Sequence, residues 1–332
     1  MTSGHFLVTG ASGFVGKRLV ERLLRRGDRV CAVGRREGWA REWRARNDAG
    51  LRVFRGDLSD GEFVGRLWRE AGSFDGVFHF AAQIPSDLRG EPNEHPLERY
   101  VRSNVLATAT VLDAASGPAR LPLVYSSTIS VYGHIDRLPI DEDHPTCPSD
   151  RYGVTKLHGE ECVRFAAGQG EIRASILRFP GMIGIGNNYG AIHLYTSQIL
   201  QGDPVSVYGN GAPRKDYIAV DDVVEASLLA MDRTGGFQCE AFNIGGSEPG
   251  MSPPTLREVA QMVVEAHGSG TVITNDRKPA EPVHMYFDNL KAHRMLGYSP
   301  RLLEDRVREY VHARRVAGAR TVHPTSQRLG GR

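Results

Sequence analysis

Three glycines stand at three-residue intervals near the start of the chain, in the run LVTGASGFVG. They are Gly10, Gly13 and Gly16, and the apolar run HFLVT (5–9) comes directly before them. The stretch that follows, 14–26, has its apolar residues at helical spacing. A strand, a tight glycine turn and a helix form the opening unit of a doubly wound sheet, so this feature limits the possible folds more than any other.

The same alternation continues through the first half of the chain. Apolar runs typical of buried strands recur at 29–33, 51–54, 76–80, 122–127 and 172–179. Stretches with helical spacing lie between them, at 60–71, 95–116 and 150–167. This alternation predicts an α/β fold in which a parallel sheet has helices on both faces. After residue 180 glycine and proline become frequent, and helical stretches recur at 191–201, 221–231 and 255–267.

Composition excludes several classes of function. The 332 residues include 41 Lys and Arg and 39 Asp and Glu, and a net charge of +2 gives no electrostatic footprint for nucleic acid. No apolar run approaches the ~18 residues of a membrane span, and the first residues lack the features of a signal peptide. The four cysteines have no CxxC spacing and the 12 histidines no ligand spacing. We therefore expect no metal site and a reduced, cytoplasmic protein.

The glycine turn predicts a dinucleotide site. The first glycine permits the turn, the second lets a pyrophosphate approach the backbone, and the third lets helix and strand pack closely. Free N–H groups at the helix start, over Gly13, Phe14, Val15 and Gly16, would face the anion. The spacing is GxxGxxG rather than GxGxxG, so a purely structural strand–turn–helix is the competing interpretation.

The end of the second strand bears on the choice of cofactor. An acid there would accept a hydrogen bond from a ribose hydroxyl, but the sequence reads CAVGRR, with Arg35 and Arg36 in that place. Arginine pairs with a 2′-phosphate, which favours NADP over NAD. The alternative is that Arg35 and Arg36 are merely solvated loop residues. Asp57 and Leu58 follow the third strand. Asp57 would accept from the adenine amino group or cap the next helix.

Tyr152 and Lys156 are candidates for acid–base chemistry. Their i, i+4 spacing on the helix predicted over 150–167 places both on one face. A nearby ammonium would lower the pKa of the phenol, which could then take a proton from a sugar hydroxyl while a nicotinamide accepts hydride. The alternative is that the pair is ordinary helix surface.

A hydroxyl-rich run, SSTISVYG, ends the strand predicted over 122–127. Ligands bind at this edge of open α/β sheets, and a hydroxyl there could hold the substrate oxygen beside Tyr152. An ordinary Ser/Thr-rich turn is the alternative.

Seven motifs occur in one order: TGASGFVG, GDLSD, HFAA, SSTISVYG, YGVTK, PVSVYGNGAPRKDYIAVDD and FNIGG. Together they resemble the extended short-chain dehydrogenase/reductases of the NAD-dependent epimerase/dehydratase type, chiefly enzymes of nucleotide sugars. The resemblance covers about residues 5 to 310. It implies a Rossmann cofactor domain over 1–178, to which the chain returns around 217–245. Residues 179–312 would form mainly a smaller C-terminal substrate-binding domain, and the polar stretch 313–332 a flexible tail.

The resemblance also implies roles for single residues. Thr128 takes the place of the catalytic serine or threonine, and Tyr152 that of the acid/base. Lys156 would assist Tyr152 and hold the nicotinamide ribose. Asn104 would support the site. Three further positions are expected to lie against ligands, Ala81 and Ala82 on the pyrophosphate side of the cofactor and Ser86 towards the substrate.

The sequence departs from the family pattern in places. Dehydratases of this family have two acids after the catalytic threonine, where this chain has Ile129 and Ser130, so dehydration by that route is not expected. Gly181 stands where nucleotide-sugar enzymes often have asparagine. A diphosphate-binding arginine is replaced by Lys215, preceded by Arg214, and Arg277 is a second candidate for that role. Lysine keeps the charge and loses the bidentate geometry.

The preferred interpretation is an NAD- or NADP-dependent epimerase of a nucleoside-diphosphate sugar that acts through a transient keto-sugar. A net ketoreductase that consumes NADPH is the first alternative, and Arg35 favours it. A non-catalytic cofactor-binding protein and a reductase of a substrate without a nucleotide are the others. The resemblance further implies a homodimer that pairs through the helices near 95–116 and 150–167.

Overall fold

The centre of the molecule is a seven-stranded sheet with the order β10-β6-β5-β4-β1-β2-β3. The computed structural model describes residues 3–85, 95–117, 119–275 and 284–321. The strands of this sheet are β1 (His5–Thr9), β2 (Arg29–Gly34), β3 (Leu51–Arg55), β4 (Gly76–His79), β5 (Leu121–Thr128), β6 (Ile172–Phe179) and β10 (Cys239–Asn243). Every neighbouring pair is parallel, which confirms the predicted doubly wound α/β fold. The strand order reverses between β1 and β4, where such folds bind ligands.

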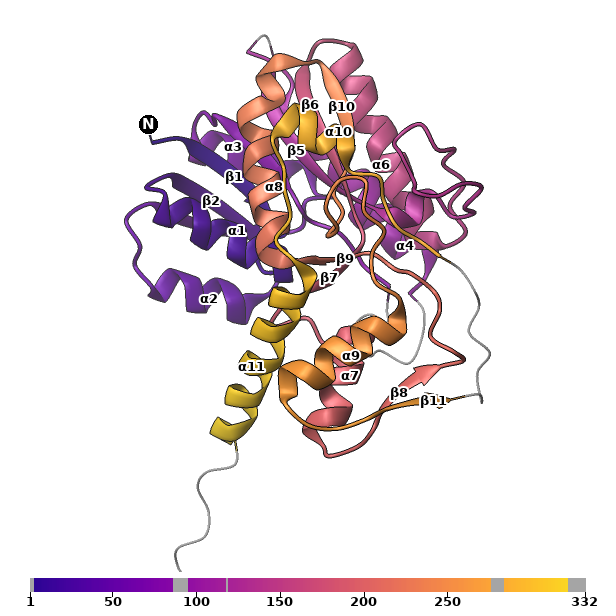
Figure 1. The fold of residues 1–332 in the computed structure, drawn as a ribbon. Coiled ribbons are helices and arrows are strands. Elements are labelled where there is room, and N and C mark those ends of the chain that lie inside the picture. Colours follow the sequence, from indigo (N-terminus) through magenta and orange to yellow (C-terminus); the bar gives the residue numbers. More distant parts are fainter. Residues whose placement is uncertain (1–2, 86–94, 118, 276–283, 322–332) are drawn as a thin grey trace, which may run out of the picture.

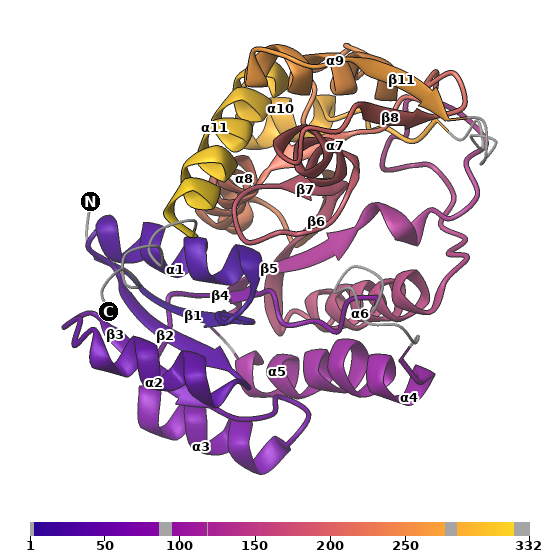
Figure 2. The same ribbon diagram turned by 90° about the horizontal axis from the view of Figure 1, so that it is seen from below.

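Helices cover both faces of the sheet (Figure 2). One face packs against α1 (Phe14–Arg25), α8 (Val220–Arg233) and α10 (Leu290–Leu296), and α2 (Glu37–Ala45) adds Trp39 and Trp43 to that core. The other face packs against α3 (Gly61–Ala71), α5 (Ala107–Ala115) and α6 (Arg151–Gly168). The short helix α4 (Leu97–Tyr100) continues through a π-helical turn (Val101–Leu106) into α5.

Alternate residues of each strand enter different cores. In β1, Phe6 and Val8 join the core under α1 and α8, whereas Leu7 joins the core under α3, α5 and α6. Successive side chains of a strand point to opposite faces, so a strand covered on both sides is mainly apolar along its whole length. This burial explains the unbroken apolar runs in the sequence.

A second group of elements has its own core (Figure 1). It contains α7 (Ala191–Leu200), α9 (Leu256–His267) and α11 (Leu303–Thr321). Two short parallel pairs accompany them, β8 (Val205–Tyr208) with β11 (Val272–Asn275) and β7 (Gly181–Ile183) with β9 (Tyr217–Ala219). Between β9 and α9 the chain returns to the main sheet at β10, which lies beside β6. The boundary placed at residue 178 stays a prediction.

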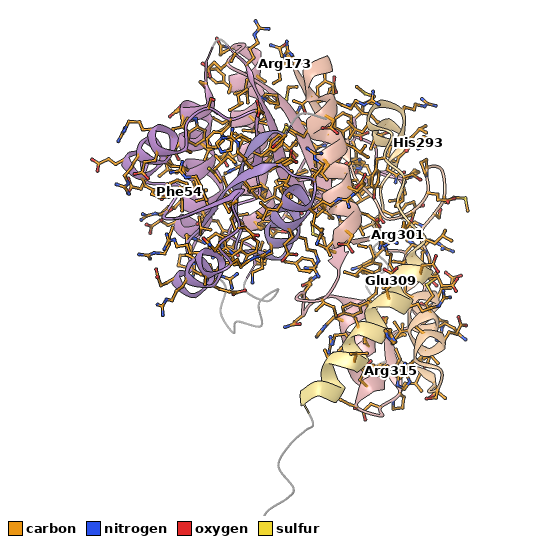
Figure 3. The ribbon with its side chains drawn as sticks, turned by 90° about the vertical axis from the view of Figure 1, so that its left-hand side faces the viewer. Phe54, Arg173, His293, Arg301, Glu309 and Arg315 are labelled. Carbon is orange, nitrogen blue, oxygen red and sulfur yellow. The ribbon has the colours of Figure 1, made fainter. Side chains whose placement is uncertain are left out.

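The helix α11 runs to Thr321, so residues 313–321 are helical in the structure, whereas the sequence predicted a tail without regular structure from residue 313. Arg314 explains part of the difference, because its guanidinium donates to Ser197 on α7 at 3.2 Å and to Tyr310 at 3.0 Å. Figure 3 shows Arg315 on this helix, far from Phe54 on the edge strand β3. Residues 322–332 lie outside the described part of the chain.

Candidate active site

The glycine turn has the shape that a cofactor cradle requires. Gly10 has φ of +65°, and a Cβ there would lie 2.5 Å from the Phe80 carbonyl oxygen at the end of β4. A Cβ at Gly16 would collide with the Gly10 carbonyl oxygen. At Gly13 a Cβ would meet only the Gly10 oxygen, at 3.0 Å, so the space beside this residue is open. Since α1 begins at Phe14, its N-terminal N–H groups adjoin that space, and the residues present fit a pyrophosphate.

Arg35 and Arg36 follow β2 beside this turn, and both are exposed. The Arg36 guanidinium donates to the Ser12 carbonyl oxygen inside the glycine turn. Nη1 of Arg35 lies 3.4 Å from Oγ of Ser103 in the π-helical turn. Both cations therefore border the place where the ribose of a bound dinucleotide would lie.

Asp57 does not cap the following helix, because Asp60 does so by accepting from the Glu62 and Phe63 N–H groups. Asp57 Oδ1 instead accepts from the Ser59 N–H at 3.0 Å and the Ser59 hydroxyl at 2.8 Å. Burial raises the pKa of Asp57, but the Ser59 hydrogen bonds and the charges of Arg102 and Arg35 outweigh it and hold the pKa below its usual range.

Leu58 is buried next to Asp57, and its carbonyl oxygen accepts from the Thr110 hydroxyl of α5. The link fixes this loop against the helix layer, so the carboxylate of Asp57 lies on an anchored segment.

The end of β4 is joined to β1 through Thr9. Its hydroxyl oxygen accepts from the N–H groups of Phe80 and Ala81, each at 3.1 Å, which brings Ala81 against the glycine turn. Ala81 and Ala82 are half-buried there. Ser86 and Arg277 lie outside the described residues, so their predicted roles stay predictions.

Asn104 lies in the π-helical turn and is fully buried. Its Oδ1 accepts from the Gln83 N–H at 2.7 Å, and its Nδ2 lies 3.0 Å from Oγ1 of Thr155 on α6. The side chain thus ties the loop after β4 to the helix that carries the candidate catalytic residues. π-Helical turns within α-helices, such as the one that carries Asn104, are frequent at functional sites.

Tyr152 and Thr128 are brought together from two elements. Asp150 caps α6 by accepting from the Gly153 N–H at 2.7 Å, which places Tyr152 in the first helical turn. Thr128 is the last residue of β5, and its hydroxyl lies close enough to the Tyr152 side chain to lower the pKa of the phenol.

The pKa of Tyr152 is raised, so the predicted lowering is wrong for the protein by itself. Burial is the main cause and the charge of Asp150 adds to it, whereas the nearby Thr128 hydroxyl opposes both. The phenol form therefore prevails at neutral pH.

Lys156 is buried, with 2% of its surface exposed. Its ammonium nitrogen lies 4.0 Å from the centroid of the Tyr125 ring. Burial lowers the pKa of Lys156 to about 7, and the charge of Glu160 opposes this shift. Only a modest change of surroundings would then decide whether this side chain is charged at neutral pH.

A buried ion pair that the sequence patterns did not predict involves the same helix, α6. Glu160 on α6 and Arg178 on β6 are almost fully buried, and their closest N–O distance is 2.6 Å. A glutamate four residues after Lys156 and an arginine within the apolar run IRASILRF were the available signals. From the sequence alone, each of these two residues would be interpreted as a solvated charge, because the packing of α6 on the sheet is not visible there.

Arg214 and Lys215, the residues predicted to bind the substrate diphosphate, differ in their surroundings. Arg214 donates to the Pro253 carbonyl oxygen at 2.6 Å and lies 3.6 Å from Glu258 on α9, so its guanidinium serves the local structure. Lys215 is exposed, and no acidic group among the described residues forms an ion pair with it. Lys215 is therefore the better candidate for a substrate phosphate.

No group of three or more His, Cys, Asp or Glu side chains within the described ranges is arranged to hold a metal ion. The ring of His79, at the end of β4, has a hydroxyl on each side. Its ring lies 2.9 Å from the Thr9 hydroxyl and 3.0 Å from that of Thr108, and burial lowers its pKa to about 3. Among the residues that the structure describes, no helix is long and apolar enough to cross a membrane.

Comparison with known proteins agrees with this geometry. The profile of the NAD dependent epimerase/dehydratase family matches residues 6–245. The chain is 32% identical to a UDP-glucose 4-epimerase of Streptomyces lividans, over 90% of this chain and 92% of that protein. It is 31% identical to a dTDP-glucose 4,6-dehydratase of Streptomyces antibioticus, over 90% and 88% of the two chains.

A solved structure is also similar in fold. The UDP-glucuronic acid 4-epimerase of Bacillus cereus, in complex with UDP-glucuronic acid and NAD, superposes with a TM-score of 0.76. The sequence identity is 26%, over 93% of this chain and 99% of that one.

Proposed function

The chain belongs to the NAD-dependent epimerase/dehydratase family and is an enzyme of the extended short-chain dehydrogenase/reductase type, and we propose that it epimerises a nucleoside-diphosphate sugar. One observation carries the proposal. Thr128, at the carboxyl end of β5, lies beside Tyr152, and Tyr152 shares one face of α6 with Lys156. The carboxyl edge of the sheet is also where the glycine turn opens.

Each residue of this group has a definite task. Thr128 holds the oxygen of the reacting sugar hydroxyl beside the phenol of Tyr152. Tyr152 accepts the hydroxyl proton as phenolate and returns it, as phenol, to the oxygen of the transient ketone. Lys156 supplies positive charge that stabilises the phenolate. A bound NAD or NADP would accept the hydride from the sugar carbon and give it back to the other face of the ketone.

The raised pKa of Tyr152 sets a condition on the first step. The phenol loses its proton at neutral pH only when positive charge comes close to it. The Lys156 ammonium is the source that the chain itself offers. The positive ring of a bound oxidised nicotinamide would add to it.

Epimerisation is favoured over dehydration because Ile129 and Ser130 follow Thr128 and neither supplies an acid for elimination of water. The substrate class is inferred from the relatives, whose names give sugars linked to UDP or dTDP. The 4-epimerase among them favours inversion at the 4-carbon. Lys215 would meet the diphosphate. The cofactor is NAD or NADP, and Arg35 is the residue that would select NADP.

Incubation of the purified protein with UDP- and dTDP-hexoses, each with NAD or NADP, tests the proposal. NMR of the sugar identifies the product, and absorbance of reduced nicotinamide follows the cofactor. We expect an epimer with no net change of cofactor. Stoichiometric consumption of NADPH on a keto-sugar would show the alternative, a ketoreductase.

A homodimer is part of the proposal. Four apolar side chains on the α4–α5 segment and on α6 have between 42% and 67% of their surface exposed, namely Leu97, Val101, Leu106 and Phe165. These helices lie side by side on one face of the molecule (Figure 2). Contact between two such faces would cover the apolar side chains. A cytoplasmic location stays a proposal that rests on the four free cysteines.

A further inference from the structure

Glu160 continues the line of candidate catalytic residues on α6. Tyr152, Lys156 and Glu160 follow one another at four-residue intervals, so they lie along one face of the helix. Glu160 is fully buried, and the proposed reaction gives it no task. Burial of a carboxylate costs free energy unless partners compensate for the lost water. The partners of Glu160 therefore indicate its role.

Both oxygens of the Glu160 carboxylate are engaged. Oε1 accepts from the Ser127 hydroxyl at 2.5 Å and from Nε of Arg178 at 3.0 Å. Oε2 accepts from Nη2 of Arg178 at 2.6 Å and from Arg164 at 3.2 Å. Ser127 directly precedes Thr128 on β5, so the carboxylate of Glu160 joins the end of that strand to the helix of Tyr152 and Lys156.

Arg178 extends the connection across the sheet. Its Nη1 donates to the Tyr132 hydroxyl at 2.7 Å, and that hydroxyl donates to Oδ1 of Asn243 at 2.7 Å. Tyr132 follows Thr128 by four residues, and Asn243 ends β10. The network therefore joins α6 to the carboxyl ends of β5, β6 and β10.

Glu160 is also the anion that acts on Lys156. The other titratable groups close to Lys156 are His79 from β4, Tyr125 from β5 and Tyr152 from α6. Burial lowers the pKa of His79 and raises those of Tyr125 and Tyr152, so all three are uncharged at neutral pH. Hydrogen bonds from Arg178 outweigh the burial of Glu160 and keep its pKa below the usual range, so its charge is present.

We propose that Glu160 is a positioning residue for this enzyme, which fixes Thr128 relative to Tyr152 through Ser127 and provides the counter-charge that keeps Lys156 an ammonium. Arg178 has the second part of the task, since its bidentate contact orients the carboxylate. The inference rests on the proposed function, because it concerns the same three side chains. A purely structural ion pair would affect stability and leave the titration of the active site unchanged.

The test compares Glu160→Gln with Glu161→Gln. The two substitutions remove the same charge from neighbouring positions of α6, but the Glu161 side chain is 64% exposed and lies 3.6 Å from Arg164. The measurements are kcat and kcat/KM against pH, and cofactor affinity against pH by fluorescence titration. Thermal unfolding identifies folded variants.

Loss of the anion should lower the pH at which Lys156 loses its proton. We expect the alkaline limb of the Glu160→Gln rate profile to move down by about one pH unit or more, with an equal shift in cofactor affinity. The Glu161→Gln profile should coincide with that of the wild type. If Glu160→Gln does not fold, Glu160→Gln/Arg178→Gln removes both buried charges together, which proteins often tolerate, and should show the same shift.

Coincident profiles for the Glu160 and Glu161 variants, in an active wild-type enzyme, would overturn the inference and leave the proposed function intact. A wild-type protein that neither binds the cofactor nor converts any sugar would overturn the proposed function, and the inference with it.

Discussion

The ammonium nitrogen of Lys156 lies 4.0 Å from the centroid of the Tyr125 ring, in the interior of the protein. A cation over an aromatic face is attracted by the ring quadrupole, and the attraction grows when both groups are desolvated. The Tyr125 hydroxyl also donates to the Lys156 carbonyl oxygen at 3.4 Å. Tyr125 thus contacts the head of the side chain and the backbone that carries it.

Replacement of Tyr125 separates these two contacts. Tyr125→Leu removes the ring, and loss of a desolvated cation–π contact of about 1–2 kcal/mol should weaken cofactor binding roughly 5- to 30-fold at neutral pH. Tyr125→Phe keeps the ring and loses only the hydroxyl bond, so it should bind nearly as the wild type does. Calorimetric titration of both variants decides, and equal losses would show that the ring makes no special contribution.

Lys156→Met should bind the cofactor weakly and yet be more stable than the wild type in acid. The folded-state pKa of Lys156, about 7, lies below its unfolded value. The unfolded chain therefore binds the extra proton between pH 7 and the unfolded pKa, and wild-type stability rises with pH across that window. Below pH 7 Lys156 is charged in the folded and the unfolded protein, so burial of its ammonium lowers the free energy of unfolding of the wild type by the full amount.

Denaturant unfolding of the wild type and Lys156→Met at pH 6, 8 and 10 measures this effect. The advantage of the methionine variant should be largest at pH 6 and shrink as the pH rises. An advantage that is independent of pH would mean that Lys156 does not titrate in this range.

Arg35 should govern the choice of cofactor. We expect NADP to bind at least as well as NAD, because a charge-assisted bond from Arg35 to the 2′-phosphate is worth about 1.5–3 kcal/mol. Arg35→Ala should reduce NADP affinity by roughly one to two decades and leave NAD affinity nearly unchanged. Titration of both cofactors into both proteins is the measurement, and Arg41→Ala, another exposed arginine, is the control. Tighter NAD binding with unaltered NADP affinity would make Arg35 an ordinary surface charge.

Phe165→Glu should shift the protein towards a monomer. The Phe165 side chain is 67% exposed on α6, and a carboxylate in the centre of an apolar contact would be desolvated at high cost. Light scattering coupled to size exclusion, with Met251→Glu as an exposed apolar control from outside these helices, measures the mass. A wild-type monomer, or a dimer that tolerates the change, would contradict the proposed dimer face.

Much of the fold could be predicted because its signals are local. The predicted strands at 5–9 and 172–179 coincide with β1 and β6, since a strand that is covered on both faces is mainly apolar. The helix boundaries at Phe14 and Leu256 lie within a residue of the predicted ones, where a glycine and a threonine precede the helix.

Features that depend on contacts between distant segments could not be predicted. The continuation of α11 past residue 313 involves Arg314 and α7, which are more than a hundred residues apart. The raised pKa of Tyr152 follows from burial, which an i, i+4 spacing does not reveal. The charge of Glu160 becomes meaningful only once β6 brings Arg178 beside it.

Tyr152→Phe should lower kcat by about 10²–10⁴ and leave cofactor affinity nearly unchanged, because only the proton carrier is lost and the ring remains. Tyr208→Phe, at an exposed position of β8, is the matched control and should retain full activity. Full turnover of the Tyr152 variant would remove this residue from the mechanism.

A substrate labelled with deuterium at the carbon that is inverted tests the proposed transient oxidation most directly. If the hydride leaves that carbon and returns to its opposite face within one active site, the epimer formed in ordinary water keeps its deuterium and no reduced cofactor accumulates. A product that has exchanged its deuterium for solvent hydrogen, or one formed with stoichiometric oxidation or reduction of the cofactor, would contradict epimerisation by hydride transfer.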